Sequence, residues 1–152
     1  MENSIERSID LAAPRDRVWR AITDAREFEQ WFRCEIEGEF EVGKIVNCRS
    51  RYHEADAEQV TWQKRIVSME PQEKFVYVWT PGETGADMYE ESLGQTTVEF
   101  ELEERGAETT LLIRESGFAN LPEGYGERSF RINTEGWNAQ VNNITAYINA
   151  NS

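Results

Sequence analysis

The stretch GWNAQVNNITAYI, residues 136–148, decides the fold of this chain. Its large apolar residues recur at positions i, i+4, i+7 and i+11 and form a single stripe: Trp137, Val141, Ile144 and Ile148. This spacing predicts a long C-terminal helix that begins between Glu127 and Thr134 and frays from Asn149 onward. Gly136 inside the helix costs about 1 kcal/mol relative to alanine, which suggests close packing or an access point for a ligand.

Short strands fill the sequence upstream of this helix. Residues 96–103 alternate, with Val98, Phe100 and Leu102 on the apolar face and polar side chains between them. Similar patterns predict strands at 4–11, 40–42, 45–50, 59–69, 75–79 and 109–115. In the 59–69 segment Trp62 and Ile66 share one parity and Val67 and Met69 the other, so it either buries both faces or contains a bulge. Which parity faces the interior stays open.

Two short helices are predicted after the first strand. Pro14 opens one, because proline lacks an N–H that the first helical turn leaves unpaired anyway. Phe28, Trp31 and Phe32, at i, i+3 and i+4, form the apolar face of the other. We therefore predict an α+β fold in one domain, residues 1–152. A curved antiparallel sheet of about six to seven strands wraps around the only helix long enough to cover it, and a space remains where the two diverge.

Charge and composition exclude several classes of function. The chain has 29 acidic and 16 basic residues among 152, a net charge of −13. Such a chain repels phosphate backbones and anionic lipids, so nucleic acid and membrane partners are not expected. No signal peptide is visible, and Cys34 and Cys48 are too few for a disulfide framework, which favours the cytoplasm. His53–Glu58 holds the single histidine but lacks the ligand pattern of a zinc or calcium site, so we predict no metal and no cofactor.

The order and spacing of these elements resemble the helix-grip superfamily of birch-pollen-allergen-like and StAR-related lipid-transfer domains. Within it the chain is similar to the family named after the C-terminal domain of the activator of the heat-shock-protein-90 ATPase. The residues that carry the resemblance are Leu11-Ala12-Ala13-Pro14-x4-Trp19, Phe28-x2-Trp31-Phe32, Gly38-x-Phe40-x-Val42-Gly43, Glu70-Pro71-x3-Phe75-Val76-Tyr77-Val78-Trp79, Thr97-Val98-x-Phe100-x-Leu102, Thr109-x-Leu111-x-Ile113-x-Glu115-x-Gly117-Phe118 and Gly136-Trp137. Two departures are Lys44, where many members have a second glycine, and the absence of the additional N-terminal domain of the eukaryotic co-chaperones.

The resemblance implies a ligand cavity between the sheet and the C-terminal helix. The side chains predicted to line it are Trp31, Phe32, Trp62, Tyr77, Trp79, Phe100, Ile113, Glu115, Trp137, Gln140 and Val141. Glu115 shares parity with Leu111 and Ile113 and should therefore point inward. A buried carboxylate is costly unless it is paired, so Glu115 is expected to lie at a rim, to form an ion pair or to face a ligand.

Three functions are compatible with these features. The sequence favours a non-enzymatic binder of a small hydrophobic molecule, acting as a monomer or homodimer. The second is an enzyme of the polyketide cyclase or dehydratase kind, in which a cavity-facing titratable group moves a proton. The third is a stress-response module that acts on a chaperone protein, which requires a contiguous exposed apolar patch.

Overall fold

The computed structural model describes residues 3–50, 61–79 and 94–151. Its elements are β1 (Ser4–Leu11), α1 (Arg15–Thr23), α2 (Ala25–Phe32), β2 (Cys34–Glu37), β3 (Ile45–Ser50), β4 (Thr61–Glu70), β5 (Lys74–Trp79), β6 (Thr96–Arg105), β7 (Glu108–Ser116), the 3-10 helix η2 (Phe118–Asn120) and α3 (Tyr125–Asn151). The predicted α+β architecture is confirmed.

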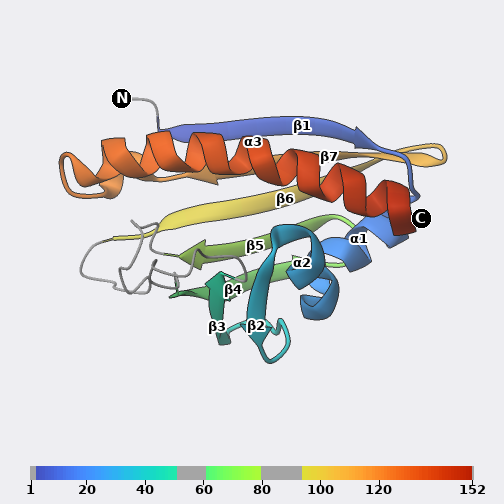
Figure 1. The fold of residues 1–152 in the computed structure, drawn as a ribbon, viewed down its shortest axis with the longest axis horizontal. Coiled ribbons are helices and arrows are strands. Elements are labelled where there is room, and N and C mark those ends of the chain that lie inside the picture. Colours follow the sequence, from blue (N-terminus) through green and yellow to red (C-terminus); the bar gives the residue numbers. More distant parts are fainter. Residues whose placement is uncertain (1–2, 51–60, 80–93, 152) are drawn as a thin grey trace, which may run out of the picture.

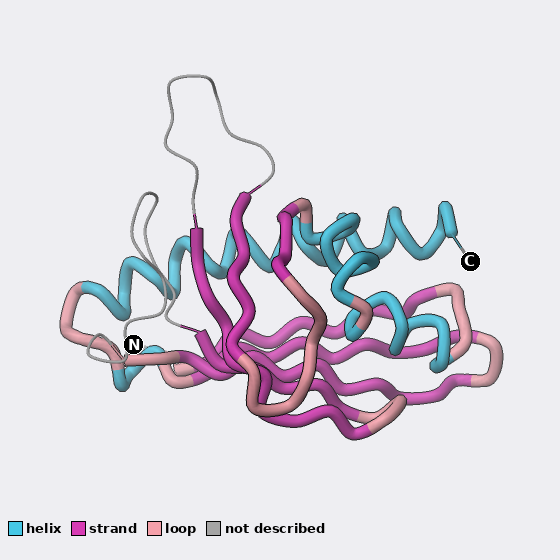
Figure 2. Tube along the Cα trace, turned by 90° about the horizontal axis from the view of Figure 1, so that it is seen from below, coloured by secondary structure: helices cyan, strands magenta, loops and turns pink. Residues whose placement is uncertain are grey.

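The strands form one seven-stranded antiparallel sheet in the order β1-β7-β6-β5-β4-β3-β2. Neighbours along the chain from β2 to β7 are neighbours in the sheet, and β1 closes the other edge against β7. The sheet curves beneath α3, which runs lengthwise across one face and packs against β1 and α2 (Figures 1 and 2). This is the helix-grip arrangement that the sequence predicts.

The apolar stripe of α3 forms part of the core. Trp137, Ile144 and Ile148 are buried, and Val141 is half-buried against the same cluster. Beneath them lie alternate residues of the sheet, among them Tyr77, Phe100 and Ile113. The spacing of the stripe therefore predicted the covered face of the helix correctly.

The predicted boundaries fail at two places. The strand predicted at 40–42 is absent, and the chain instead forms β2 at Cys34–Glu37, directly after Arg33 ends α2 in the left-handed conformation (φ 64°). The long helix begins at Tyr125, before the predicted window, and continues to Asn151 instead of fraying from Asn149. This end of the helix is held by Phe130, which packs against Phe118 of η2 with ring centres 5.3 Å apart.

The ambiguity in the 59–69 segment is resolved by a bulge. The pairing of β4 with β5 shifts between Ile66 and Ser68, which leaves Val67 as an extra residue. Before the bulge, Lys64 and Ile66 point inward and are buried, with Trp62 half-buried on the same face. That parity is the one that faces the interior.

Cys34 and Cys48 are both buried and free of a disulfide. His53–Glu58 lie outside the described residues. No helix in the described part of the chain is long and apolar enough to cross a membrane.

Candidate functional site

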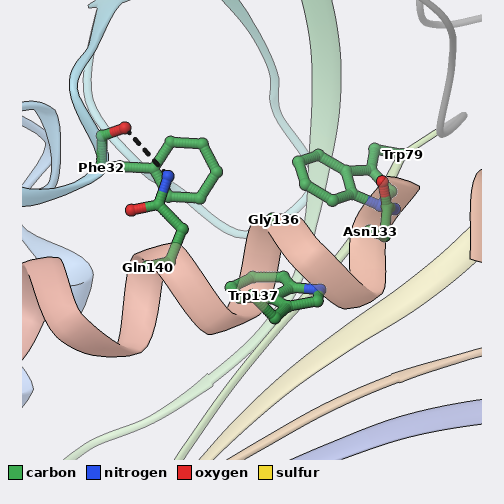
Figure 3. A pocket seen from close by; sticks show the side chains of 6 residues that line it. All are labelled: Phe32, Trp79, Asn133, Gly136, Trp137 and Gln140. Atoms are coloured by element: carbon green, nitrogen blue, oxygen red, sulfur yellow. Dashed lines mark hydrogen bonds between the residues drawn. The ribbon is translucent and has the colours of Figure 1, made fainter. Parts of the chain in front are cut away.

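A small cavity lies where α3 passes the end of α2 and the end of β5. It has a volume of about 110 Å³ and is lined by Phe32, Trp79, Asn133, Gly136, Trp137 and Gln140. Phe32 and Gln140 stand on one side, Trp79 and Asn133 on the other, and Gly136 and Trp137 lie between them (Figure 3). Pockets for drug-sized ligands usually measure about 300–1,000 Å³, so this one fits a single ring or a short apolar segment.

Gly136 keeps the cavity open. A methyl group added at this position would meet nothing outside its own helix within 4 Å. The missing side chain therefore leaves open space, here called the notch, between the Phe32 and Trp79 sides of the cavity. The open space excludes close packing, one of the two roles that the sequence suggested for the glycine, and the access point for a ligand stays a prediction.

The aromatic walls are held by ring contacts around Trp137. Its ring centre lies 6.3 Å from that of Trp79 and 6.2 Å from that of Phe32. A hydrogen bond also connects the Phe32 side to α3. Gln140 Nε2 donates it to the backbone carbonyl oxygen of Phe32 at 3.1 Å. The amides of Asn133 and Gln140 are the polar groups of an otherwise aromatic wall.

Glu115 lies outside the cavity and accepts hydrogen bonds from side chains that line it. Its register places it across from Val98 and diagonal to Thr96, which in turn pairs with Trp79. The carboxylate is fully buried and accepts hydrogen bonds from the indole N–H groups of Trp79 and Trp137, both at 2.8 Å. Thr96 Oγ1 donates at 2.5 Å and Asn133 Nδ2 at 2.9 and 3.1 Å. Three of the six cavity-lining residues therefore donate hydrogen bonds to one carboxylate.

Glu115 is found in neither of the two surroundings expected for a structural carboxylate, a rim position or an ion pair. It is neither at a rim nor in an ion pair, because four uncharged donors satisfy its oxygens. Burial raises the pKa of this carboxyl group, and the hydrogen bonds from Thr96, Trp137, Trp79 and Asn133 oppose that rise. It also does not line the cavity. Its role in the site is to orient the side chains that do.

The structure brings four of the eleven predicted site residues together around the cavity: Phe32, Trp79, Trp137 and Gln140. The others lie elsewhere. Trp31, Tyr77, Phe100 and Ile113 are buried in the core, Trp62 and Val141 are half-buried against it, and Glu115 lies behind the wall.

Two lining residues were absent from the predicted set, Asn133 and Gly136. Their spacing could have revealed them, because Asn133, Gly136 and Gln140 stand at i, i+3 and i+7 and so share one helix face.

The sequence matches the model of one protein family over residues 12–149, nearly its whole length. The chain belongs to the Activator of Hsp90 ATPase homolog 1-like protein family. This match confirms the resemblance on which the cavity was predicted. A comparison with curated protein sequences finds no match to this member of the family.

Solved structures share the fold of this family member at low sequence identity. A protein from Arthrobacter aurescens has a TM-score of 0.77 and 19% identity, with 98% of this chain and 87% of that one covered. MLL2253 from Mesorhizobium loti has a TM-score of 0.75 and 19% identity, with 98% of both chains covered. DynU16, a protein of the dynemicin biosynthetic locus, has a TM-score of 0.69 and 18% identity. The alignment covers 98% of this chain but only 48% of DynU16, so this chain spans about half the length of that protein.

Proposed function

We propose that this protein binds a small, mainly apolar molecule that places a planar ring in the cavity beside Gly136. The observation that carries the proposal is the notch itself, with aromatic walls, two amides and no side chain where a filling one would fit. Apolar walls with a few placed polar groups are typical of ligand pockets. The ring would contact Phe32 and Trp79, and the amides of Asn133 and Gln140 would bind a polar substituent.

The lining residues favour a binder over an acid–base enzyme. The six that surround the cavity carry aromatic rings, amides or no side chain. Proton transfer needs a titratable group within hydrogen-bond reach of the substrate. Glu115, the group named for that role from the sequence, has its oxygens engaged by protein donors.

Filling the notch should abolish binding. We expect Gly136→Phe to lose at least about tenfold in affinity, because the ring would occupy the ligand's space, whereas Gly136→Ala should bind normally. The measurement is a thermal-shift and tryptophan-fluorescence screen of flavonoid, fatty-acid and polyketide-like compounds. Each tenfold excess of ligand over Kd adds about 1.4 kcal/mol to the stability of a protein that binds it only when folded.

Gly136→Ala is the matched control, because it changes the same helical position but leaves most of the notch open. Unliganded melting temperatures of both variants show whether each is folded. Equal binding by wild type and Gly136→Phe would contradict the site, and no stabilisation of wild type by any of the three compound classes would contradict the function.

A protein-binding role is the second candidate, and an exposed apolar patch favours it. Val42, Ile45 and Val67 are 61%, 48% and 39% exposed. Backbone hydrogen bonds from Gly43 N to Ile66 O and from Ile66 N to Lys44 O hold the turn with Val42, and the start of β3 with Ile45, beside Val67 of β4. Such a patch is what an interaction module requires.

The patch predicts the outcome of a chaperone assay. If this protein acts on a heat-shock-protein-90 chaperone, it should raise the chaperone's ATPase rate, and Ile45→Glu should raise the half-saturating concentration about tenfold because it charges the patch. Ile132→Glu, at an equally exposed position on α3, is the control and should leave that concentration unchanged. No stimulation by wild type, or equal loss in both variants, would contradict this candidate.

A further inference from the structure

Lys64 of β4 is a buried amine enclosed by aromatic rings. Its side chain is 1% exposed, and Nζ lies 3.7 Å from the ring centre of Phe28, 4.2 Å from that of Tyr77 and 4.8 Å from that of Phe40. Ring faces attract a cation, but they supply no counter-charge. A buried ammonium group without an anion is costly, so this lysine calls for an explanation.

No carboxylate of the described residues supplies that anion. None of the ion pairs among residues 3–50, 61–79 and 94–151 includes Lys64. Two buried acids of the core are already engaged. Glu29 accepts a hydrogen bond from Ile36 N at 2.6 Å and pairs with Arg26, and Glu115 is satisfied by its four donors. Burial lowers the pKa of the Lys64 amine, and the nearby thiols of Cys48 and Cys34 oppose that shift.

Two buried polar groups on the same face as Lys64 have no hydrogen-bond partner in the described structure. The indole Nε1 of Trp62 and the hydroxyl of Tyr77 are buried without a hydrogen bond. Trp62 and Lys64 are alternate residues on the inner face of β4, and Tyr77 lies beside them on β5, across from Ile66. Buried donors are nearly always paired, so two such groups beside a buried amine indicate a missing acceptor.

Phe32 connects this polar cluster to the cavity. Its ring lines the cavity, and the ring centre lies 5.9 Å from Lys64 Nζ and 6.2 Å from the ring centre of Trp62. The ring of Phe32 therefore stands between a ligand in the cavity and the donors of Lys64 and Trp62. Rotation of that ring would let the end of a ligand in the cavity reach these donors.

We propose that the ligand is a carboxylic acid whose carboxylate binds Lys64, Tyr77 and Trp62 while its apolar part fills the cavity beside Gly136. The inference rests on the proposed binding function and names its ligand class. A carboxylate supplies both what the cluster lacks, a negative charge and hydrogen-bond acceptors, and the three groups can donate to its oxygens. The overall charge of −13 opposes anions at long range, so an acid-binding site needs such a buried local cation.

Calorimetry with matched pairs of ligands tests the proposal. The probes are 3-phenylpropanoate against 3-phenylpropanol and decanoate against decanol, which share an apolar part and differ in the head group. We expect wild type to bind each acid at least about tenfold more tightly than its alcohol, as hydrogen bonds to charged groups require. Lys64→Met should erase this preference without weakening the alcohols. Tyr77→Phe, which keeps the ring and removes the hydroxyl, should reduce the preference about fivefold.

Lys44→Met is the control for loss of one positive charge, because Lys44 is exposed and pairs with Glu41. It should leave the acid preference intact. Acids and alcohols that bind wild type equally, or an acid preference that survives in Lys64→Met, would overturn the carboxylate site and leave the proposed function standing. If neither acids nor alcohols bind wild type, the proposed function fails and this inference fails with it.

Discussion

Replacing Ile144 with alanine should lower the free energy of unfolding by about 2–5 kcal/mol, the range for a large-to-small change in a packed core. Ile144 is fully buried in the stripe with which α3 covers the sheet. The substitution removes three carbon atoms where the surrounding strands cannot collapse, so the lost contacts add to the lost burial. Urea denaturation followed by circular dichroism measures the change, provided that the slope with denaturant stays constant.

Ile132→Ala provides the matched control on the same helix. Ile132 is 48% exposed, so the same change in side chain should alter stability by less than about 0.5 kcal/mol. The difference between the two variants isolates burial from helix propensity. A loss below about 0.5 kcal/mol for Ile144→Ala would show that this face of the helix is not core.

The sequence predicts well the parts of the fold that one local residue pattern determines without contacts to other elements. The stripe of α3 and the alternation in β6 each specify a period and a buried face, and both are found as predicted. The start of α3 at Tyr125 and strand β2 depend on contacts outside each element, such as the packing of Phe130 on Phe118 and the pairing of β2 with β3. Local spacing carries no record of such contacts, so these boundaries were wrong.

The candidate site shows a similar division. Parity indicates which aromatic residues point inward, but it does not separate core from cavity wall, because Tyr77 and Trp79 share a face of β5 and only Trp79 reaches the cavity. The decisive feature is where Gly136 falls on α3 relative to the end of α2, which requires the packed structure. Lys64 shares parity with Trp62 and Ile66, but only the bulge in β4 shows that this parity faces the interior.

Glu115 links stability to the shape of the site. Its oxygen Oε2 accepts from Trp79, Thr96 and Asn133, and Oε1 accepts from Trp137 and Asn133. In Glu115→Gln one acceptor oxygen becomes an NH₂ donor, which then faces an indole N–H group. We expect a loss of about 1–3 kcal/mol at pH 7, the cost of an unpaired buried donor. Ligand binding should weaken as well, because Trp79 and Trp137 lose their common anchor.

The pH dependence of that loss follows from the pKa of the carboxyl group. Burial raises it in the folded state above its unfolded value, so the folded protein holds the proton more tightly. The contribution of Glu115 to stability is then complete below the unfolded pKa, about 4.3, and is lost as the pH rises through the folded pKa. The stability gap between wild type and Glu115→Gln should therefore widen as the solution is acidified, since other groups titrate equally in both proteins. A gap that narrows on acidification would mean that the four donors outweigh burial and hold the pKa below its unfolded value. Glu115 would then be a stable buried anion between the two tryptophans.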